Sequence, residues 1–373
     1  MNVRHFAHPG GGVYNATPDR VVFGPGSVSL LPAEVDRLGV HAPLVVTTPG
    51  RVEMGKEVAA GLGDRCAGIL PEAASQVPIE LARRGREVAA EMGADCLVAV
   101  GGGAATGLCK GIAYESGLPI IAVPTTYSGS EMTGYCGMTI DGVKRMHESP
   151  AMLASVVIYD AELSCGLPPA VTASSAMNAL AHCIDAAYLP SISPLLRPAA
   201  VEGARVVTSA LPAVLADPDD LGARNELLYG AYLAGAALTG GFALQHAVAH
   251  MLGGSFGVEH GVAHAVVLPY VTAHLVERAP EAMGRVADAV GTSDLAGHIW
   301  DVAVAAGLPV RLSDVGVGDE HMDTAVRIAS DGESYDVNTS LDAGLDNPAP
   351  VTAEVVRAIL SAAAAGGRPG AGR

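Results

Sequence analysis

A change of sequence pattern just before the middle of this chain constrains its fold more than any other feature. Before the change, short apolar runs such as 43–49 (PLVVTTP) and 119–124 (PIIAVP) alternate with helical patterns, which is typical of a doubly wound parallel sheet. After it, alanine-rich helical periodicity continues through Ala364, and the β-branched alternation of strands is largely missing. The sequence therefore predicts an α/β domain with a parallel sheet over residues 1–161, an all-α domain over residues 162–373, and a ligand-binding cleft between them.

Composition and charge exclude several classes of function. Half of the 373 residues are hydrophobic (50%) but only 4% are aromatic, so alanine, valine and leucine must fill the cores. The formal net charge of -17 argues against binding to nucleic acid or to an anionic membrane surface. The six cysteines form no C-x-x-C pair, and neither a signal peptide nor an apolar run of membrane-spanning length is present. We therefore expect a cytoplasmic protein that acts on a small molecule.

Three consecutive glycines, Gly101, Gly102 and Gly103, follow a buried strand and precede a helix. Such a turn lets backbone N–H groups approach a pyrophosphate at the N-terminus of the helix. The usual G-x-G-x-x-G spacing is absent because Thr106 stands where the last glycine should be, and no G-K-[ST] sequence follows. The glycines indicate a phosphate-binding loop, and a tight strand-to-helix turn without a ligand is the alternative.

A second loop, Val123–Gly137, also follows a buried strand and is rich in hydroxyl side chains. Because the carboxyl ends of parallel strands meet at one edge of the sheet, two such loops indicate one long ligand, such as a nucleotide. Helix caps and turns are the commoner use of each hydroxyl taken singly.

The preference between NADH and NADPH stays open. Thr47 and Thr48 stand at a strand end where NAD-selective folds often hold an acidic residue. Arg51 is close enough along the chain to contact a 2′-phosphate, although a solvated surface arginine is the alternative. The predicted cofactor-binding residues are Thr47, Gly101, Gly102, Gly103, Thr106, Thr125, Thr126, Tyr127 and Ser130.

Four of the 12 histidines fall in the stretch Leu244–Tyr270. His246 and His250 are four residues apart, as are His260 and His264, so each pair lies on one face of a helix. Imidazole is a common metal ligand and titrates near neutral pH. The stretch therefore predicts a metal site or a proton-handling site, with hydrogen-bonded core histidines as the alternative.

These motifs occur together in an order that resembles the iron-containing alcohol dehydrogenase superfamily, and within it the maleylacetate reductases. The glycine loop is followed by PTTYSGSE (124–131), SAMNALAHCIDA (175–186) and the histidine stretch. The likeness runs from RVVFGPGS (20–27) to DNPAPVTAEVVRAIL (346–360). The resemblance implies a nucleotide-binding α/β domain, a helical second domain, a nicotinamide bound between them, and a homodimer.

The resemblance also bears on metal binding. In the metal-dependent members an aspartate and three histidines hold a divalent cation, and the matching positions here are Asn178, His182, His246 and His260. An amide is neutral and a poor ligand for a hard cation. We therefore expect no bound metal; if one is retained, the remaining candidates are His182, His246 and His260.

The reaction implied by the resemblance is reduction of maleylacetate to 3-oxoadipate by NADH or NADPH, in aromatic compound catabolism. Reduction of a carbon-carbon double bond conjugated to a ketone spreads the charge into an enolate, which hydrogen-bond donors stabilise without a metal. His250 matches a histidine that faces the nicotinamide and is the best candidate for the acid, whereas His264 either takes part or only orients its neighbours. The candidate catalytic residues are His250, His246, His182, Asn178 and His260.

Some positions depart from the maleylacetate reductase pattern. Gln245, His246 and Ala247 replace an HHK-like run, and Tyr270 replaces a histidine. The pocket is thus less basic than a dicarboxylate requires, although Lys144 and Arg145, expected on a loop near the cleft, remain possible carboxylate binders. Two alternatives stay open. One is a reductase or alcohol dehydrogenase that acts on a less anionic enone or carbonyl compound in specialised biosynthesis, with or without a metal. The other is an inactive homologue that binds nucleotide.

Overall fold

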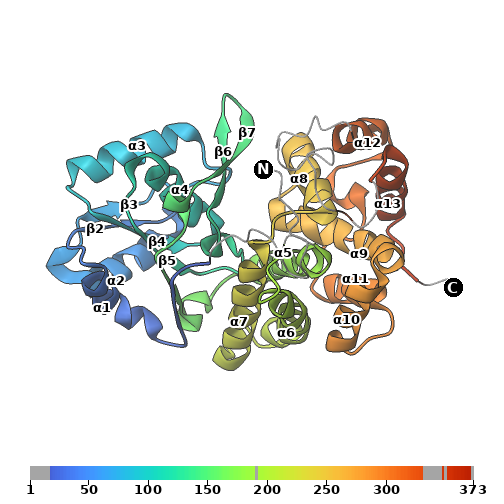
Figure 1. Cartoon of the computed structure of the whole chain (residues 1–373), viewed down its shortest axis with the longest axis horizontal. Coiled ribbons are helices and arrows are strands. Elements are labelled where there is room, and N and C mark those ends of the chain that lie inside the picture. Colours follow the sequence, from blue (N-terminus) through green and yellow to red (C-terminus); the bar gives the residue numbers. More distant parts are fainter. Residues whose placement is uncertain (1–16, 190–191, 331–346, 348–350, 371–373) are drawn as a thin grey trace, which may run out of the picture. The chain divides into compact units, whose positions relative to one another are not determined.

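The computed structural model describes residues 17–189, 192–330, 347 and 351–370 (Figure 1). These residues divide into two units, and the division falls between Leu167 and Pro168. The change of sequence pattern lies slightly earlier because β8 is followed by a short 3-10 helix, Ala161–Ser164. Asp160 caps that helix, and Leu163 packs against the core of the sheet, so the chain stays with the sheet for one more turn.

The first unit is built on a six-stranded parallel sheet, which confirms the predicted α/β fold. The strand order is β1-β8-β5-β4-β2-β3. Every residue of β2, β4, β5 and β8 is buried, as expected for parallel strands that are covered on both faces. The strands are β1 (Arg20–Phe23), β2 (Pro43–Val46), β3 (Gly68–Leu70), β4 (Cys96–Gly101), β5 (Ile120–Pro124) and β8 (Val156–Tyr159).

Four helices accompany the sheet: α1 (Leu31–Leu38), α2 (Val52–Leu62), α3 (Ile79–Glu91) and α4 (Gly103–Ser116). The buried residues of α1 and α2 share one hydrophobic core with Val45 and Val98. Helices α3 and α4 pack closely together at Gly85. A Cβ at this position would lie only 2.5 Å from Cδ1 of Ile112. The alternating strand and helix signals of the first half therefore produce a layered unit.

A two-stranded hairpin was not predicted. Strands β6 (Tyr135–Ile140) and β7 (Val143–Glu148) pair antiparallel. The turn is Asp141–Gly142, and both residues have positive φ, which is the type I′ signal of a two-residue hairpin. The expectation that Lys144 and Arg145 lie on a loop was wrong, because both belong to β7.

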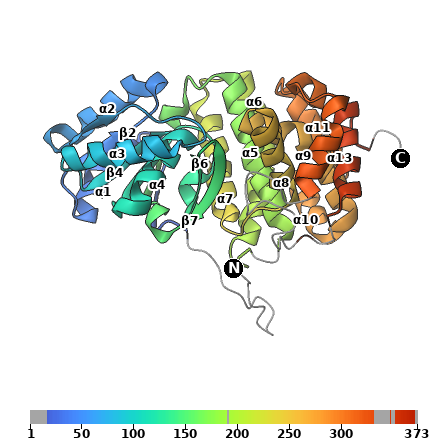
Figure 2. The same cartoon turned by 90° about the horizontal axis from the view of Figure 1, so that it is seen from above.

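The second unit consists of helices, also as predicted (Figure 2). Helix α5 is buried along most of its length and packs against α6, α7, α8 and α9. Small residues allow this close packing: a Cβ on Gly203 of α6 would lie 2.8 Å from Sγ of Cys183. The helices are α5 (Pro169–Tyr188), α6 (Arg197–Ala216), α7 (Leu221–Leu238), α8 (Leu244–Phe256), α9 (His260–Arg278), α10 (Pro280–Val290), α11 (Leu295–Ala305), α12 (Met322–Ser330) and α13 (Ala353–Ala365).

Among the described residues, α6 is the one helix with the length and apolar composition of a membrane span. Half of its apolar window is buried inside the helical unit, where α6 packs against α5 and α7. Core helices of globular units share these properties.

Candidate active site

The predicted phosphate-binding loop lies between β4 and α4. Gly101 ends β4, Gly102 is the N-cap of α4, and Gly103 is the first helical residue. No side chain caps α4, and its first turn holds no acidic residue. The N–H groups at this helix end are thus left for an anion, which the helix dipole also favours.

The loop stands beside the point where the order of the strands reverses. From β2 the chain leads outward to the edge strand β3 and then returns to β4, on the other side of β2. In open α/β sheets, ligands bind at the carboxyl ends of the strands next to such a switch point. Gly101 and Thr47 mark these ends for β4 and β2.

The second predicted loop closes against the first. The backbone N–H of Thr125 donates to the carbonyl oxygen of Gly101 at 2.9 Å. A Cβ on Gly102 would lie only 2.7 Å from Oγ1 of Thr126, whereas a Cβ on Gly103 would stay 3.7 Å from Oγ of Ser128. Glycine is therefore required at position 102 because the two loops approach each other there.

The predicted cofactor-binding residues fall into two groups. Gly102, Gly103, Thr126 and Ser130 are half-buried and remain accessible. Gly101 is buried, and the side chains of Thr47, Thr106, Thr125 and Tyr127 are at most 2% exposed, so these four side chains shape the loops from inside.

Lys110, which sequence reasoning missed, holds the second loop in place. This lysine of α4 is 1% exposed. Its ammonium donates to the carbonyl oxygens of Ser130 (2.5 Å) and Tyr135 (2.7 Å) and to Oγ1 of Thr133 (3.1 Å). Burial lowers the pKa of Lys110 to about 8. The signal available in the sequence was a single charged residue, between Cys109 and Gly111, in an otherwise uncharged part of the predicted helix.

Substitution of Lys110 by methionine should destabilise the α/β unit. The two carbonyl oxygens and the threonine hydroxyl would lose a charged donor, so we expect the free energy of unfolding to fall by about 2–3 kcal/mol. Urea denaturation measures this change. The matched control is Lys56→Met, because Lys56 is 57% exposed and its loss should change stability by no more than about 0.5 kcal/mol. Equal effects of the two substitutions would contradict the assigned role.

Substitution of Gly102 by alanine should weaken nucleotide binding. The new Cβ would push Thr126 and its loop away, and we expect the Kd for NADH or NADPH to rise about tenfold, which corresponds to about 1.4 kcal/mol. Fluorescence titration of the reduced cofactor measures this. Gly103→Ala is the matched control, since its Cβ makes only an ordinary contact, and it should raise the Kd less than about threefold. A larger effect at position 103 than at position 102 would refute this explanation.

Five histidines form one cluster inside the helical unit: His182, His246, His250, His260 and His264. Helix α5 supplies His182, α8 supplies His246 and His250, and α9 supplies His260 and His264. The ring centroids are 5.0 Å apart for His182–His246, 4.6 Å for His246–His264, 4.7 Å for His260–His264 and 5.3 Å for His250–His260. The i, i+4 pairs thus come together as their spacing predicted.

Burial within this cluster is uneven. His182, His246 and His264 are at most 3% exposed, whereas His250 and His260 are half-buried. Asn178, one turn before His182 in α5, is also buried. Burial, reinforced by the neighbouring imidazoles, lowers the pKa of both His182 and His264 well below the ordinary value. These two rings are therefore neutral near pH 7.

Asp185 is a second residue that sequence reasoning missed. Its carboxylate accepts hydrogen bonds from Nδ1 of His246 at 2.6 Å and from the hydroxyl of Tyr188 at 3.0 Å. It also accepts from the backbone N–H groups of Ala243 (3.1 Å), Gln245 (3.2 Å) and His246 (3.1 Å). The first turn of α8 has no side-chain cap at its own N-cap position, so a residue of α5 caps it.

This contact determines which nitrogen of His246 faces the rest of the cluster. With Nδ1 held by Asp185, the remaining nitrogen is Nε2, which is buried and has no hydrogen-bond partner among the described residues. The signal in the sequence was an acidic residue three positions after His182, on the helix face that also carries Asn178.

The residues that match the family's metal ligands fit a cation poorly. The rings of His182 and His246 are stacked with an interplanar angle of 14°. At the position that matches the family's aspartate ligand, Asn178 offers a neutral amide instead of a carboxylate.

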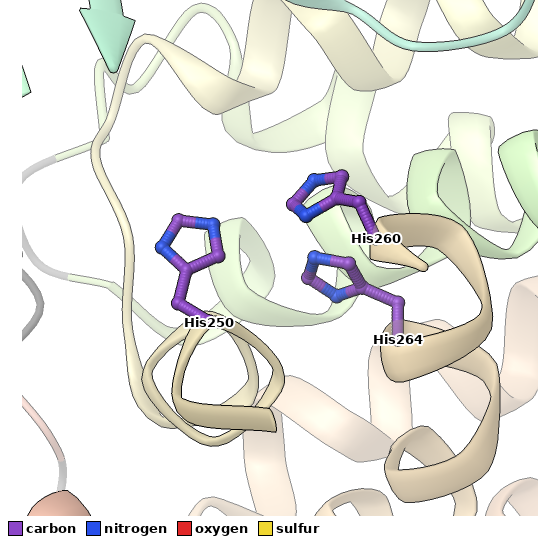
Figure 3. Close-up of side chains that lie close together, drawn as sticks. All are labelled: His250, His260 and His264. Carbon is purple, nitrogen blue, oxygen red and sulfur yellow. The ribbon is translucent and has the colours of Figure 1, made fainter. Parts of the chain in front are cut away.

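A different group of histidines has the spacing of a metal site. Among the described residues, His250, His260 and His264 bring one nitrogen each within 4.8 Å of the others (Figure 3). Of these, only His260 was among the predicted metal candidates. The side-chain amide nitrogen of Gln245 lies 3.2 Å from Nδ1 of His264, so this nitrogen already has a hydrogen-bonding neighbour inside the protein.

Comparison with known proteins places the whole chain in one family. Residues 18–161 match the iron-containing alcohol dehydrogenase model, and residues 172–364 match the model of the C-terminal part of the Fe-containing alcohol dehydrogenase family. The chain is 41% identical to a maleylacetate reductase of Burkholderia cepacia over 96% of its own length and 99% of the relative's. A maleylacetate reductase of Rhizobium sp. is 39% identical over the same shares of the two chains.

Solved structures agree with this placement. The crystal structure of the Rhizobium maleylacetate reductase superposes with a TM-score of 0.88 and covers 96% of this chain and 99% of its own. A putative alcohol dehydrogenase from Ralstonia eutropha has a TM-score of 0.89 with 43% identity, and covers the same shares of the two chains. The chain therefore belongs to the iron-containing alcohol dehydrogenase family and is an oxidoreductase, a reductase of the branch that includes the maleylacetate reductases.

Proposed function

We propose that this enzyme uses NADH or NADPH to reduce the carbon-carbon double bond of a conjugated oxo acid, maleylacetate in the first instance, without a bound metal. The observation that carries the proposal is the cluster of five histidines, at which an amide (Asn178) stands in place of the metal-binding carboxylate. The names of the relatives at 39–41% identity supply the substrate class.

The nucleotide would bind to the α/β unit. The uncapped N-terminus of α4 and the accessible backbone of Gly102 and Gly103 suit a pyrophosphate. Thr126 and Ser130 border the same loop. Arg51, which follows β2 and is half-buried, suits the 2′-phosphate of NADPH. Positions 47 and 48 hold threonines, so they offer no carboxylate that would select for the unphosphorylated ribose of NADH. Both cofactors should therefore be assayed.

The histidine cluster would carry the chemistry of the reduction. When bound, the cofactor supplies a hydride, which adds to the alkene carbon remote from the ketone and leaves oxidised cofactor and an enolate. His182 and His264, which are neutral, can donate hydrogen bonds to the enolate oxygen. A protonated histidine then gives its proton to the carbon next to the ketone, and His250 is our candidate for this acid. Asn178 and His260 would border the substrate.

A less anionic enone is the second candidate substrate, favoured by a specific observation. The hydroxyl of Tyr270, which replaces a histidine of the maleylacetate reductase pattern, donates to the carbonyl oxygen of Val310 at 2.7 Å and so contributes no positive charge. The carboxylate of Glu259 caps α9 by accepting from the N–H groups of Gly261 and Val262.

Oxidation of NADH and NADPH should be followed with maleylacetate and with a panel of neutral enones and simple ketones. Turnover of maleylacetate supports the first candidate, and turnover of a neutral enone alone supports the second. If the cofactor binds but no compound is reduced, the chain is an inactive nucleotide-binding homologue. The same protein, purified without added cations, should keep its activity after chelation; stoichiometric metal whose removal abolishes turnover would contradict the metal-free mechanism.

We also propose a cellular location and an oligomeric state for the enzyme. We expect a cytoplasmic homodimer that binds neither nucleic acid nor membranes, in line with a formal net charge of -17. Light scattering after gel filtration tests the dimer.

A further inference from the structure

Gln245 is a fully buried residue (0% exposed) at the start of α8, and its side chain contacts one histidine twice. Its amide nitrogen lies 3.2 Å from the backbone carbonyl oxygen of His264 and 3.2 Å from Nδ1 of the same residue. Gln245 stands where the resemblance to the maleylacetate reductases leads us to expect a histidine.

The two contacts together determine the tautomer of His264. A carbonyl oxygen can only accept a hydrogen bond, so the group that faces it must be the amide NH₂ and not the amide oxygen. One hydrogen of the NH₂ points to the carbonyl and the other points to Nδ1. Nδ1 is thus an acceptor, and in a neutral imidazole the ring hydrogen must then be on Nε2.

The Nε2 atom of His264 is placed to act on a ligand. It is buried and has no hydrogen-bond partner within the described part of the chain. A ring nitrogen of His264 lies within 4.8 Å of ring nitrogens of the half-buried His250 and His260, and the three side chains lie close together (Figure 3). A buried N–H donor without a protein partner costs free energy unless a ligand accepts from it.

We infer that Gln245 holds His264 as the Nε2–H tautomer, and that this N–H is the hydrogen-bond donor to the enolate oxygen. The group of His250, His260 and His264, which has the spacing of a metal site, is then a site for a negatively charged oxygen. The assignment to the enolate rests on the proposed function; the assignment of the tautomer does not.

The neighbouring ring provides an internal contrast. His246 lies 4.6 Å from His264, centroid to centroid, but its Nδ1 faces the Asp185 carboxylate at 2.6 Å. A carboxylate that accepts from backbone N–H groups has no hydrogen to donate, so Nδ1 of His246 carries the ring hydrogen. The two adjacent rings therefore carry a hydrogen on different nitrogens, Nε2 in His264 and Nδ1 in His246.

Nitrogen NMR of the nucleotide-free enzyme, labelled with ¹⁵N in its histidine rings, tests the tautomers without any substrate. We expect a protonated Nε2 and an unprotonated Nδ1 for His264, and a protonated Nδ1 for His246. His264→Gln, which removes one set of signals, assigns them. A protonated Nδ1 in His264 would overturn the inference.

Titration with Co²⁺ tests whether a substitution at Gln245 turns the group of His250, His260 and His264 into a metal-binding site. The wild type should bind the ion weakly. Gln245→Glu places a carboxylate against Nδ1, which should move the hydrogen to Nδ1, expose the Nε2 lone pair and lower the Kd for Co²⁺ at least about tenfold. Gln245→Leu, which adds no carboxylate, controls for the loss of the amide and should gain less. Tight binding by the wild type that His264→Gln abolishes would refute the inference.

Kinetics test the role of the donor. His264→Phe removes the N–H and should lower kcat about 10²–10³-fold, with an unchanged Kd for the reduced cofactor. His264→Gln restores an N–H donor and should recover part of the loss. An unchanged kcat in His264→Phe would refute the donor role. If the wild type reduces no enone at all, the proposed function fails, and the NMR and Co²⁺ results still decide the tautomer.

Discussion

Replacement of Asp185 by alanine should lower the free energy of unfolding of the helical unit by about 3–5 kcal/mol, the range for removal of one partner from a buried charged contact. The carboxylate accepts from three backbone N–H groups and from Nδ1 of His246, and all four groups are buried. Alanine would leave them without an acceptor and would uncap α8. Urea denaturation followed by circular dichroism measures the change.

The matched control is Tyr188→Phe. The hydroxyl of Tyr188 donates to Asp185 at 3.0 Å and accepts from the N–H of Leu244 at 3.3 Å, so its loss weakens the same region but leaves the carboxylate in place. We expect a cost of about 1 kcal/mol. Equal losses in the two variants would show that the carboxylate is not the main support of α8.

Replacement of His250 by alanine should lower kcat by about 10²–10⁴-fold, the usual contribution of a general acid, while the Kd for NADH or NADPH changes little. His250 is half-buried at the accessible side of the cluster, beside His260 and Phe242, where it can exchange protons with solvent between turnovers. Steady-state kinetics and cofactor titration on the same preparation separate the two effects.

His274→Ala is the control for this substitution. His274 is a half-buried histidine of α9 that lies outside the cluster, so its loss should leave kcat unchanged. A kcat of His250→Ala close to that of the wild type would remove His250 from the role of proton donor and leave His246, with its carboxylate partner, as the next candidate.

The predicted elements that came from simple periodicity agree with the structure. The apolar runs 43–49 and 119–124 became β2 and β5, because strands buried on both faces of a parallel sheet need unbroken apolar sequence. The hairpin β6–β7 was missed, although Asp141–Gly142 carries the signal of its turn. Its strands, with charged residues such as Lys144 and Arg145, lack the apolar alternation by which strands were recognised.

The sequence by itself determined which chemical groups this protein has and which of them share a helix face or a strand end: the glycines after β4, and the histidine pairs of α8 and α9. Only the tertiary structure decided how those groups act. Asp185 reaches His246 across 61 positions of the chain, Lys110 reaches Ser130 across 20, and Gln245 reaches His264 across 19. Periodicity describes neighbours within one element, whereas the hydrogen on an imidazole is placed by whichever donor or acceptor another element brings to it.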